Sequence, residues 1–150
     1  VQLLEQQPAV GLLGTAYQSD GNIMTNPLTD LAIRNQMLFR CPFCHVTVMM
    51  RKSVLDEVGG YDEAFGYSED WDMWLRMGAH TQMANLPDVT TEIINESASL
   101  SGSYFLKQLP LNRKLIKKHL KNYPGRWKAM LYHFFIQLFF FFLIIGYRIV

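Results

Sequence analysis

The chain has few of the residues that hold small metalloproteins and secreted domains together. Its 150 residues include two cysteines and four histidines, and its formal net charge is +1. Two cysteines cannot build a disulfide framework, and a closed structural zinc site usually takes four Cys or His ligands. A charge so close to zero provides no field that would steer the protein toward nucleic acid. We therefore expect no disulfide scaffold, no zinc finger and no nucleic-acid partner.

Both cysteines lie in one short stretch, CPFCH, at residues 41–45. Taken alone, Cys41 and Cys44 followed by His45 have the spacing of a c-type haem attachment motif, and C-x-x-C also occurs in zinc sites and redox pairs. A small haem or redox protein is therefore one hypothesis. The residues that follow, VTVMM, favour a strand rather than a helical haem pocket. We expect no haem here, and interpret the cysteines as small apolar residues in a reducing cytosol.

Strands alternate with helices along the sequence, which predicts an α/β fold. The predicted strands lie at residues 10–14, 45–50 and 82–94, the last of them interrupted by a turn. The predicted helices lie at residues 26–39, 53–58 and 68–80. Asp20-Gly21 marks a turn, and Asn26 and Ser68 are expected to cap the first and third helices. A polar loop is expected at residues 95–103.

Two acidic residues, Glu69 and Asp70, stand in the first turn of the helix SEDWDMWLRMGAH at residues 68–80. One interpretation is structural, because carboxylates at a helix N-terminus complement the helix dipole. The other is catalytic, because a carboxylate on a rigid helix can take a proton from a substrate hydroxyl. Trp71 and Trp74, if buried, would anchor such a helix.

The stretch HVTVMMRKSVLDEVGGYDEAFGYSEDWDMWLRM, residues 45–77, resembles the second half of a family 2 glycosyltransferase. That family shows a strand ending in a basic residue, a short helix, G-G-Y-D-E, a variable loop and E-D-x-D-x-W-x-R. The sequence contains every element: Gly59, Gly60, Tyr61, Asp62, Glu63, Glu69, Asp70, Asp72, Trp74 and Arg76. The resemblance implies a partial GT-A (Rossmann-like nucleotide-diphospho-sugar transferase) fold over residues 1–105. Asp72 and Arg76, four residues apart, are expected to pair and to hold the helix together.

The resemblance also implies an activity. Such enzymes move a sugar from a nucleotide-diphosphate donor to a glycan or lipid-linked acceptor, usually with inversion of the anomeric carbon. The resemblance implies that Asp70 is the general base and that Glu69 lies beside the acceptor. It makes Gly59 and Gly60 further substrate-binding candidates. His45 is interpreted either as a substrate contact or as a hydrogen-bonded residue at the rim. The chemistry agrees, since displacement by a hydroxyl needs one proton acceptor beside it.

The family's D-x-D motif, which holds a Mg²⁺ or Mn²⁺ ion and the donor diphosphate, precedes the matched region and is absent from this sequence. Asp70-Trp71-Asp72 has the spacing but belongs to the predicted helix. Since the metal normally stabilises the leaving group, we expect a divalent cation in the full-length enzyme and no transfer by these residues alone. The alternative hypothesis is a truncated, non-catalytic, membrane-associated remnant or a partner-binding protein.

The C-terminal part is basic and then apolar. Residues 113–128 hold seven Lys and Arg and no acid, whereas residues 129–147 include only two strongly polar side chains, His133 and Gln137. These patterns predict a basic helical segment at 106–128 and a hydrophobic, membrane-associated helix at 129–150. A spanning helix, an interfacial helix and a hydrophobic dimer face all remain open. The upstream cations favour the cytoplasmic side of the cell membrane.

Overall fold

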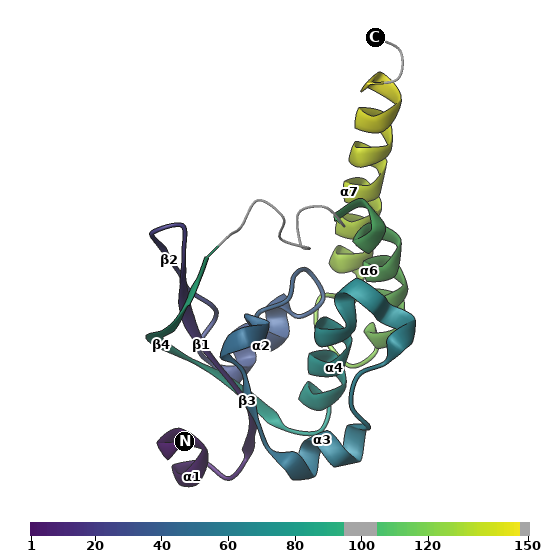
Figure 1. Cartoon of the computed structure of the whole chain (residues 1–150). Helices are drawn as coiled ribbons and strands as arrows, with labels where there is room; N and C mark the ends of the chain where they lie inside the picture. The colour runs from purple at the N-terminus through teal and green to yellow at the C-terminus, as the bar shows by residue number, and fades with distance from the viewer. Residues whose placement is uncertain (95–104, 148–150) are drawn as a thin grey trace.

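A computed structural model describes residues 1–94 and 105–147 of the chain (Figure 1). Its sheet is organised around one strand, β1 (Val10–Ser19). On one edge β1 pairs in parallel with β4 (Gln82–Ile93), and on the other it pairs antiparallel with β2 (Asn22–Met24) and β3 (Met49–Met50). This mixed sheet with helices against it confirms the predicted α/β class.

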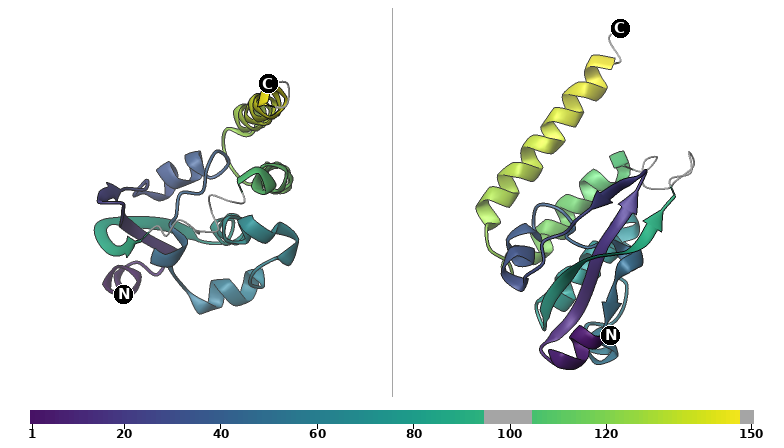
Figure 2. Two further views of the ribbon diagram at one scale, coloured as in Figure 1. Left: turned by 45° about the horizontal axis from the view of Figure 1, so that its top comes forward. Right: turned by 90° about the vertical axis from the view of Figure 1, so that its left-hand side faces the viewer.

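Helices cover both faces of the sheet (Figures 1 and 2). They are α1 (Gln2–Gln6), α2 (Asp30–Gln36), α3 (Lys52–Val58), α4 (Glu69–Gly78), α6 (Phe105–His119) and α7 (Arg126–Tyr147), with short 3-10 helices η1 (His45–Thr47) and η2 (Glu63–Ser68). Neighbouring residues of β1 point to opposite faces. Leu12 therefore joins the main core with α2, α4 and α6, while Leu13 packs with Leu4 of α1 in a smaller one.

The first predicted helix is shorter than the sequence pattern indicated. It was expected over residues 26–39 with Asn26 as its cap, but it begins at Asp30. Thr29 is the N-cap, and its side-chain oxygen accepts a hydrogen bond from the Ala32 N–H at 3.4 Å. Threonine is itself a favourable N-cap residue, so the chain has a working cap three residues later than predicted.

The predicted strand at residues 45–50 is wrong over its first half. Residues His45–Thr47 form η1, and only Met49–Met50 pair with β1. The cause is local, because the Thr47 hydroxyl donates to the Cys44 carbonyl oxygen at 2.9 Å and closes a turn. Side-chain hydrogen bonds of this kind compete with strand pairing.

The strand, turn and strand predicted over residues 82–94 form one continuous strand, β4. The expected turn is a bulge: Thr15 of β1 pairs with Leu86, and the next residue of β1, Ala16, pairs with Val89. Pro87 cannot donate to the ladder, so it sits in the irregular step between these two pairs. The polar loop predicted at residues 95–103 lies outside the described residues.

A fully buried carboxylate, Asp72 of α4, joins three helices. Its oxygens accept hydrogen bonds from Arg76 Nε at 2.7 Å, and from Lys118 Nζ and His119 Nε2 of α6 at 2.9 Å each. Arg76 also donates to the carbonyl oxygens of Val58, the last residue of α3, and Gly60. The expected pairing of Asp72 with Arg76 is confirmed. Burial by itself would raise the pKa of Asp72, but the hydrogen bonds from these three side chains outweigh it and lower that pKa.

The C-terminal region divides differently from the prediction. The basic segment expected at 106–128 is split between α6 and the start of α7, with a turn between them. Within residues 1–94 and 105–147, no helix combines the length and the apolar character needed to cross a membrane. The hydrophobic helix predicted at 129–150 is therefore not supported in that form. His133 and Gln137 interrupt its apolar sequence and donate to the carbonyl oxygens of Leu38 and Leu109.

Replacing Asp72 tests its role in stability. We expect Asp72→Ala to lower the free energy of unfolding by about 3–5 kcal/mol, because it leaves buried donors without their acceptor. Urea unfolding measures the change. Asp56→Ala is the matched control, since Asp56 pairs with Lys52 in the same i,i+4 spacing on the surface, and we expect a change within about 0.5 kcal/mol. Equal losses in the two variants would contradict the assignment.

The acid stability of the protein provides a second test. A folded-state pKa below the unfolded one gives stability that is present above the unfolded value and lost as pH falls through the folded value. We therefore expect the free energy of unfolding to decline below about pH 4, the ordinary range of an aspartate. In Asp72→Asn this part of the decline should disappear. Urea unfolding at a series of pH values from 7 to 3 measures it, and a decline identical in the two proteins would refute the assignment.

Candidate active site

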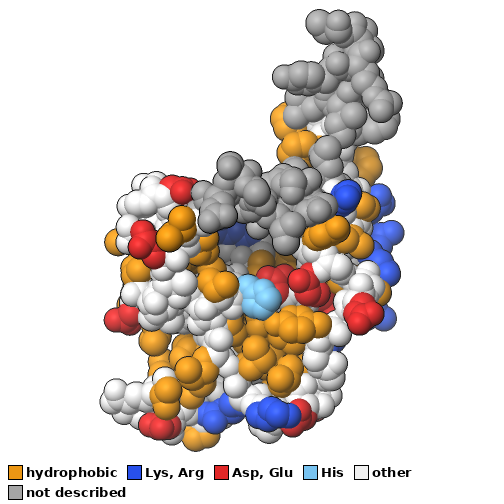
Figure 3. All heavy atoms as spheres, viewed as in Figure 1, with side chains coloured by type: hydrophobic (Ala, Val, Ile, Leu, Met, Phe, Trp, Pro, Cys, Tyr) orange, Lys and Arg blue, Asp and Glu red, His pale blue; other side chains and the backbone are white. Residues whose placement is uncertain are grey.

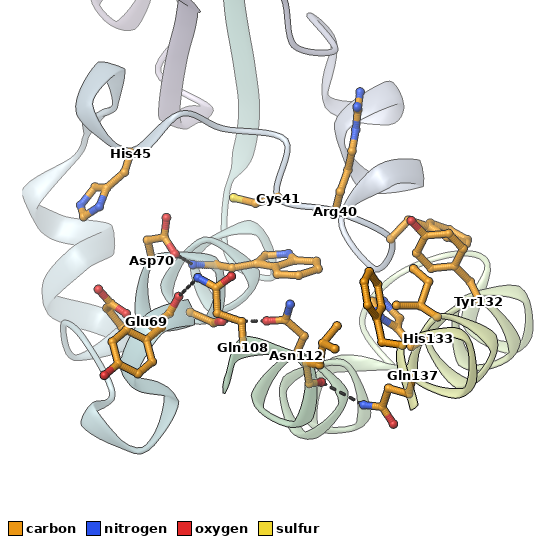
Figure 4. A pocket seen from close by; sticks show the side chains of 17 residues that line it. Arg40, Cys41, His45, Glu69, Asp70, Gln108, Asn112, Tyr132, His133 and Gln137 are labelled. Carbon is orange, nitrogen blue, oxygen red and sulfur yellow. Dashed lines mark hydrogen bonds between the residues drawn. The ribbon is translucent and has the colours of Figure 1, made fainter. Parts of the chain in front are cut away.

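A cavity of about 770 Å³ lies between α4, α6, α7 and the segment before η1 (Figure 4). Acidic residues of α4 line one side, and aromatic residues of α7 line the other. In the space-filling view, acidic side chains gather beside a histidine at a hollow in the centre of the face (Figure 3). The cavity therefore combines carboxylates, amides and aromatic rings in one concave surface, which is the usual composition of a small-molecule site.

Asp70 lies in the first turn of α4 and lines the cavity (Figure 4). The N–H of Trp71 donates to Asp70 Oδ1 at 2.7 Å. Trp71 Nε1 in turn donates to the Met37 carbonyl oxygen at 2.9 Å in the core. Trp71 and Trp74 are 7% and 0% exposed, which meets the condition set from the sequence for anchoring this helix. The carboxylate is thus fixed to a rigid helix at the cavity wall.

The electrostatic surroundings of Asp70 make it a stronger base than a free aspartate. Burial raises the pKa of Asp70, and the negative charge of Glu69 adds to that effect. The Trp71 N–H and the charge of His45 act in the opposite direction, but the net shift is upward. Because proton transfer is most efficient when the pKa of the base approaches the working pH, this shift suits a general base.

Glu69 adds a second carboxylate to the same wall. Its Oε2 atom is buried and has no hydrogen-bond partner among the described residues. Buried polar atoms in native proteins are nearly always hydrogen-bonded, so the unpartnered Oε2 atom is available to a hydrogen-bond donor from outside the chain. A substrate hydroxyl in the cavity is a donor of the required kind.

His45 lies at the cavity rim on the same side as Asp70 (Figure 4). Its side chain is exposed, and its Nε2 atom lies 2.9 Å from the Tyr61 hydroxyl. It is therefore a hydrogen-bonded rim histidine. Its position also leaves it able to contact a substrate, so neither of the two interpretations made from the sequence excludes the other.

Gly59 and Gly60 do not line this cavity. Gly59 ends α3 in the left-handed conformation, with φ of 82°, and Gly60 follows with φ of 66°. The Gly60 carbonyl accepts the hydrogen bond from Arg76 Nη2 at 2.5 Å. Two successive positive φ angles explain why glycines stand here. The structure gives them a backbone role, and their predicted contact with substrate stays a prediction.

Sequence reasoning missed the contribution of the last two helices. Gln108 and Asn112 of α6, and Tyr132, His133 and Gln137 of α7, line the cavity. The i,i+4 pairs 108/112 and 133/137 each place two polar residues on one helix face. That spacing was the available signal, but nothing in the sequence indicated which element the face would meet.

The amides of α6 also connect it to the start of α4. Asn112 Oδ1 accepts a hydrogen bond from the Ser68 hydroxyl at 2.7 Å, and Gln108 Nε2 donates to the Tyr67 carbonyl at 3.0 Å. Ser68, predicted to cap α4, makes no side-chain cap bond because its hydroxyl is used in this way.

The CPFCH stretch does not gather ligands. Cys41 and Cys44 are both free, and burial raises the pKa of the Cys41 thiol, which donates to the Phe43 carbonyl oxygen. Among the described residues, no three His, Cys, Asp or Glu side chains come together as metal ligands. The divalent cation was expected on a D-x-D motif that these residues do not include, so it stays a prediction for the full-length enzyme.

Residues 17–123 match the sequence model of the family described as "Glycosyltransferase like family 2". The chain belongs to this family. The resemblance found in E-D-x-D-x-W-x-R is thereby confirmed, and the mixed sheet fits a GT-A-like fold.

Three curated glycosyltransferases are similar to the chain. The amylovoran biosynthesis glycosyltransferase AmsE of Erwinia amylovora is 31% identical over 99 residues, which is 62% of this chain and 37% of that protein. An uncharacterized glycosyltransferase of Haemophilus influenzae is 26% identical over 117 residues, or 77% of this chain and 36% of its own length. Another from that organism is 43% identical over 51 residues, or 33% and 18%. The chain thus spans little more than a third of these relatives at most.

The closeness of His45 and Asp70 leads to a testable pKa change. The charge of His45 lowers the pKa of Asp70, so we expect His45→Ala to raise that pKa further. Carboxyl-carbon NMR titration of Asp70 measures it. His80→Ala is the matched control, because His80 is an exposed histidine paired instead with Glu57, and it should leave the Asp70 titration unchanged. A fall in the Asp70 pKa in His45→Ala would contradict this arrangement.

Proposed function

We propose that the chain is the acceptor-side part of an inverting glycosyltransferase that moves a sugar from a nucleotide-diphosphate donor to a hydroxyl of a glycan or lipid-linked acceptor. The observation that carries the proposal is Asp70, a carboxylate of raised pKa on a rigid helix at the wall of the cavity. Family membership supplies the reaction class, and the cavity supplies the base.

In the proposed reaction the acceptor hydroxyl lies against Asp70. Its oxygen forms a bond to the anomeric carbon of the donor sugar while the bond from that carbon to the diphosphate oxygen breaks. The hydroxyl proton passes to Asp70, and the nucleotide diphosphate leaves with the bonding electrons. A single displacement of this kind inverts the anomeric carbon and needs only one base. The unpartnered Oε2 atom of Glu69 accepts a hydrogen bond from a second hydroxyl of the acceptor, and this bond orients the acceptor in the cavity.

The opposite wall suits a sugar ring. Tyr132 of α7 and Phe39 stack edge to face, with ring centroids 5.7 Å apart, and both line the cavity. His133 beside them is buried, and burial lowers its pKa, so it adds no charge to this wall. Aromatic faces bind the apolar side of a ring, while the amides of Gln108 and Asn112 provide polar partners. The amylovoran assignment of one relative supports a polysaccharide acceptor.

Asp70→Asn tests the proposal in the complete protein that carries this chain. We expect turnover to fall by about 10²–10⁴-fold, since the amide cannot accept the proton, with thermal unfolding unchanged. Nucleotide release in the presence of acceptor measures turnover. Asp56→Asn, which changes an exposed aspartate of α3, is the matched control and should keep full activity.

Two results would count against the proposal. Turnover of Asp70→Asn close to that of the unaltered protein would remove Asp70 as the base. Failure of the unaltered complete protein to transfer any sugar would favour the alternative predicted from the sequence, a non-catalytic, membrane-associated remnant or a partner-binding protein.

A further inference from the structure

The outward face of α7 is made of large apolar side chains. Trp127, Leu131, Phe134, Phe135 and Phe139 are between 50 and 68% exposed. Their spacing places them on one side of the helix. An isolated exposed apolar residue needs no explanation, but a contiguous row of this size marks a surface that binds another protein or a membrane.

The two polar residues within the apolar stretch of α7, His133 and Gln137, face the opposite way. His133 donates to the Leu38 carbonyl oxygen at 2.7 Å, and Gln137 donates to the Leu109 carbonyl oxygen at 2.9 Å. Ala129, one turn before His133, is fully buried. The helix thus docks on the domain through its few polar groups and presents its apolar side to the surroundings, the reverse of an ordinary surface helix.

Cations border this apolar face. A groove of about 350 Å³ between α6 and α7 is lined by Arg113 and Lys117 together with Trp127, Leu131 and Phe134. Arg126 lies over the Trp127 ring at 5.8 Å from its centroid. The sequence from residue 105 to residue 150 contains no Asp or Glu. In Figure 3, Lys and Arg side chains gather along the right-hand edge of the molecule, over α6.

We propose that this face of α7, with the cations of α6 beside it, binds the surface of an anionic lipid bilayer. The helix lies in the plane of the interface, with its aromatic side chains among the acyl chains and its cations at the headgroups. Charge selects the occupant, because two copies of this face would bring Arg113, Lys117 and Arg126 against like charges. An anionic lipid surface is complementary to them.

Bilayer binding would place the cavity beside the lipid. The inner side of α7 carries Tyr132, His133 and Gln137 of the cavity wall, so the helix that meets the membrane also borders the acceptor site. This consequence rests on the proposed function. Of the two acceptor classes named there, a glycan and a lipid-linked acceptor, it favours the lipid-linked one. The binding itself does not depend on catalysis, and it is measured without any sugar donor.

Trp127 reports on the interface directly. It is 68% exposed, whereas Trp71 and Trp74 are buried in the core. We expect vesicles of phosphatidylcholine with phosphatidylglycerol to shift its emission to the blue, and brominated acyl chains to quench it. Trp127→Phe should remove this response while the protein still co-sediments with the vesicles. An unchanged emission spectrum in the unaltered protein would overturn the proposal.

The apolar term is tested by Leu131→Gln with Phe135→Gln. Removing two apolar side chains that would insert among the acyl chains should weaken partition into anionic vesicles by roughly tenfold or more. The matched control is Ile23→Gln with Leu31→Gln, two side chains that are 64 and 71% exposed on β2 and α2, and it should partition like the unaltered protein. Equal effects in the two double variants would overturn the proposal, and circular dichroism confirms that each is folded.

The contribution of the cations is tested by Lys117→Gln with Lys128→Gln, the second of which is an exposed lysine next to Trp127 in the first turn of α7. Each lysine near an anionic surface should account for roughly a fivefold change in partition, and high salt should reduce the difference. Lys52→Gln, on α3, is the control and should bind normally. Analytical sedimentation without lipid tests the other occupant of this face, a second copy of the protein. A self-association that Leu131→Gln with Phe135→Gln abolishes, in a protein that binds no vesicles, would assign the face to a second copy instead.

Discussion

The buried carboxylate of Asp72 is the interaction on which the candidate site depends. Three cationic or hydrogen-bonding side chains converge on it: Arg76 from its own helix, and Lys118 and His119 from α6. Arg76 extends the connection to the end of α3 through the carbonyl of Val58, and to the following loop through that of Gly60. Because α4 is held at this point, the preceding turn that carries Glu69 and Asp70 is fixed at the cavity wall. The G-G and D-x-W-x-R parts of the motif are thus joined by hydrogen bonds.

Two aspartates of one motif have opposite electrostatic environments. Asp72 faces three donors, and their hydrogen bonds hold its pKa down despite burial. Asp70, two residues earlier, faces the cavity, where burial raises its pKa and few donors oppose it. The helix turns about 100° per residue, so the two side chains leave it on different sides. One carboxylate therefore stabilises the fold and the other is available to take a proton.

The last helix has two faces with different tasks. Its inner face supplies Tyr132, His133 and Gln137 to the cavity and satisfies its polar atoms on backbone carbonyls. Its outer face carries aromatic side chains beside the cations of α6. A helix of such apolar composition can dock on the rest of the domain because His133 and Gln137 are paired with backbone carbonyls on its inner face. The wall of the cavity and the apolar surface are consequently opposite sides of one helix.

The sequence by itself determined the α/β class, the family and the pairing of Asp72 with Arg76. These follow from local spacing, which one helix turn or one motif fixes. Tertiary structure decided what local patterns cannot encode. It turned the predicted turn at Pro87 into a bulge, shortened the strand before Met50, and brought His119 onto Asp72. It also placed α7 against α4, so that residues 62 positions apart, Asp70 and Tyr132, line one cavity. Contacts between distant segments depend on how the core packs, and no short stretch of sequence contains that information.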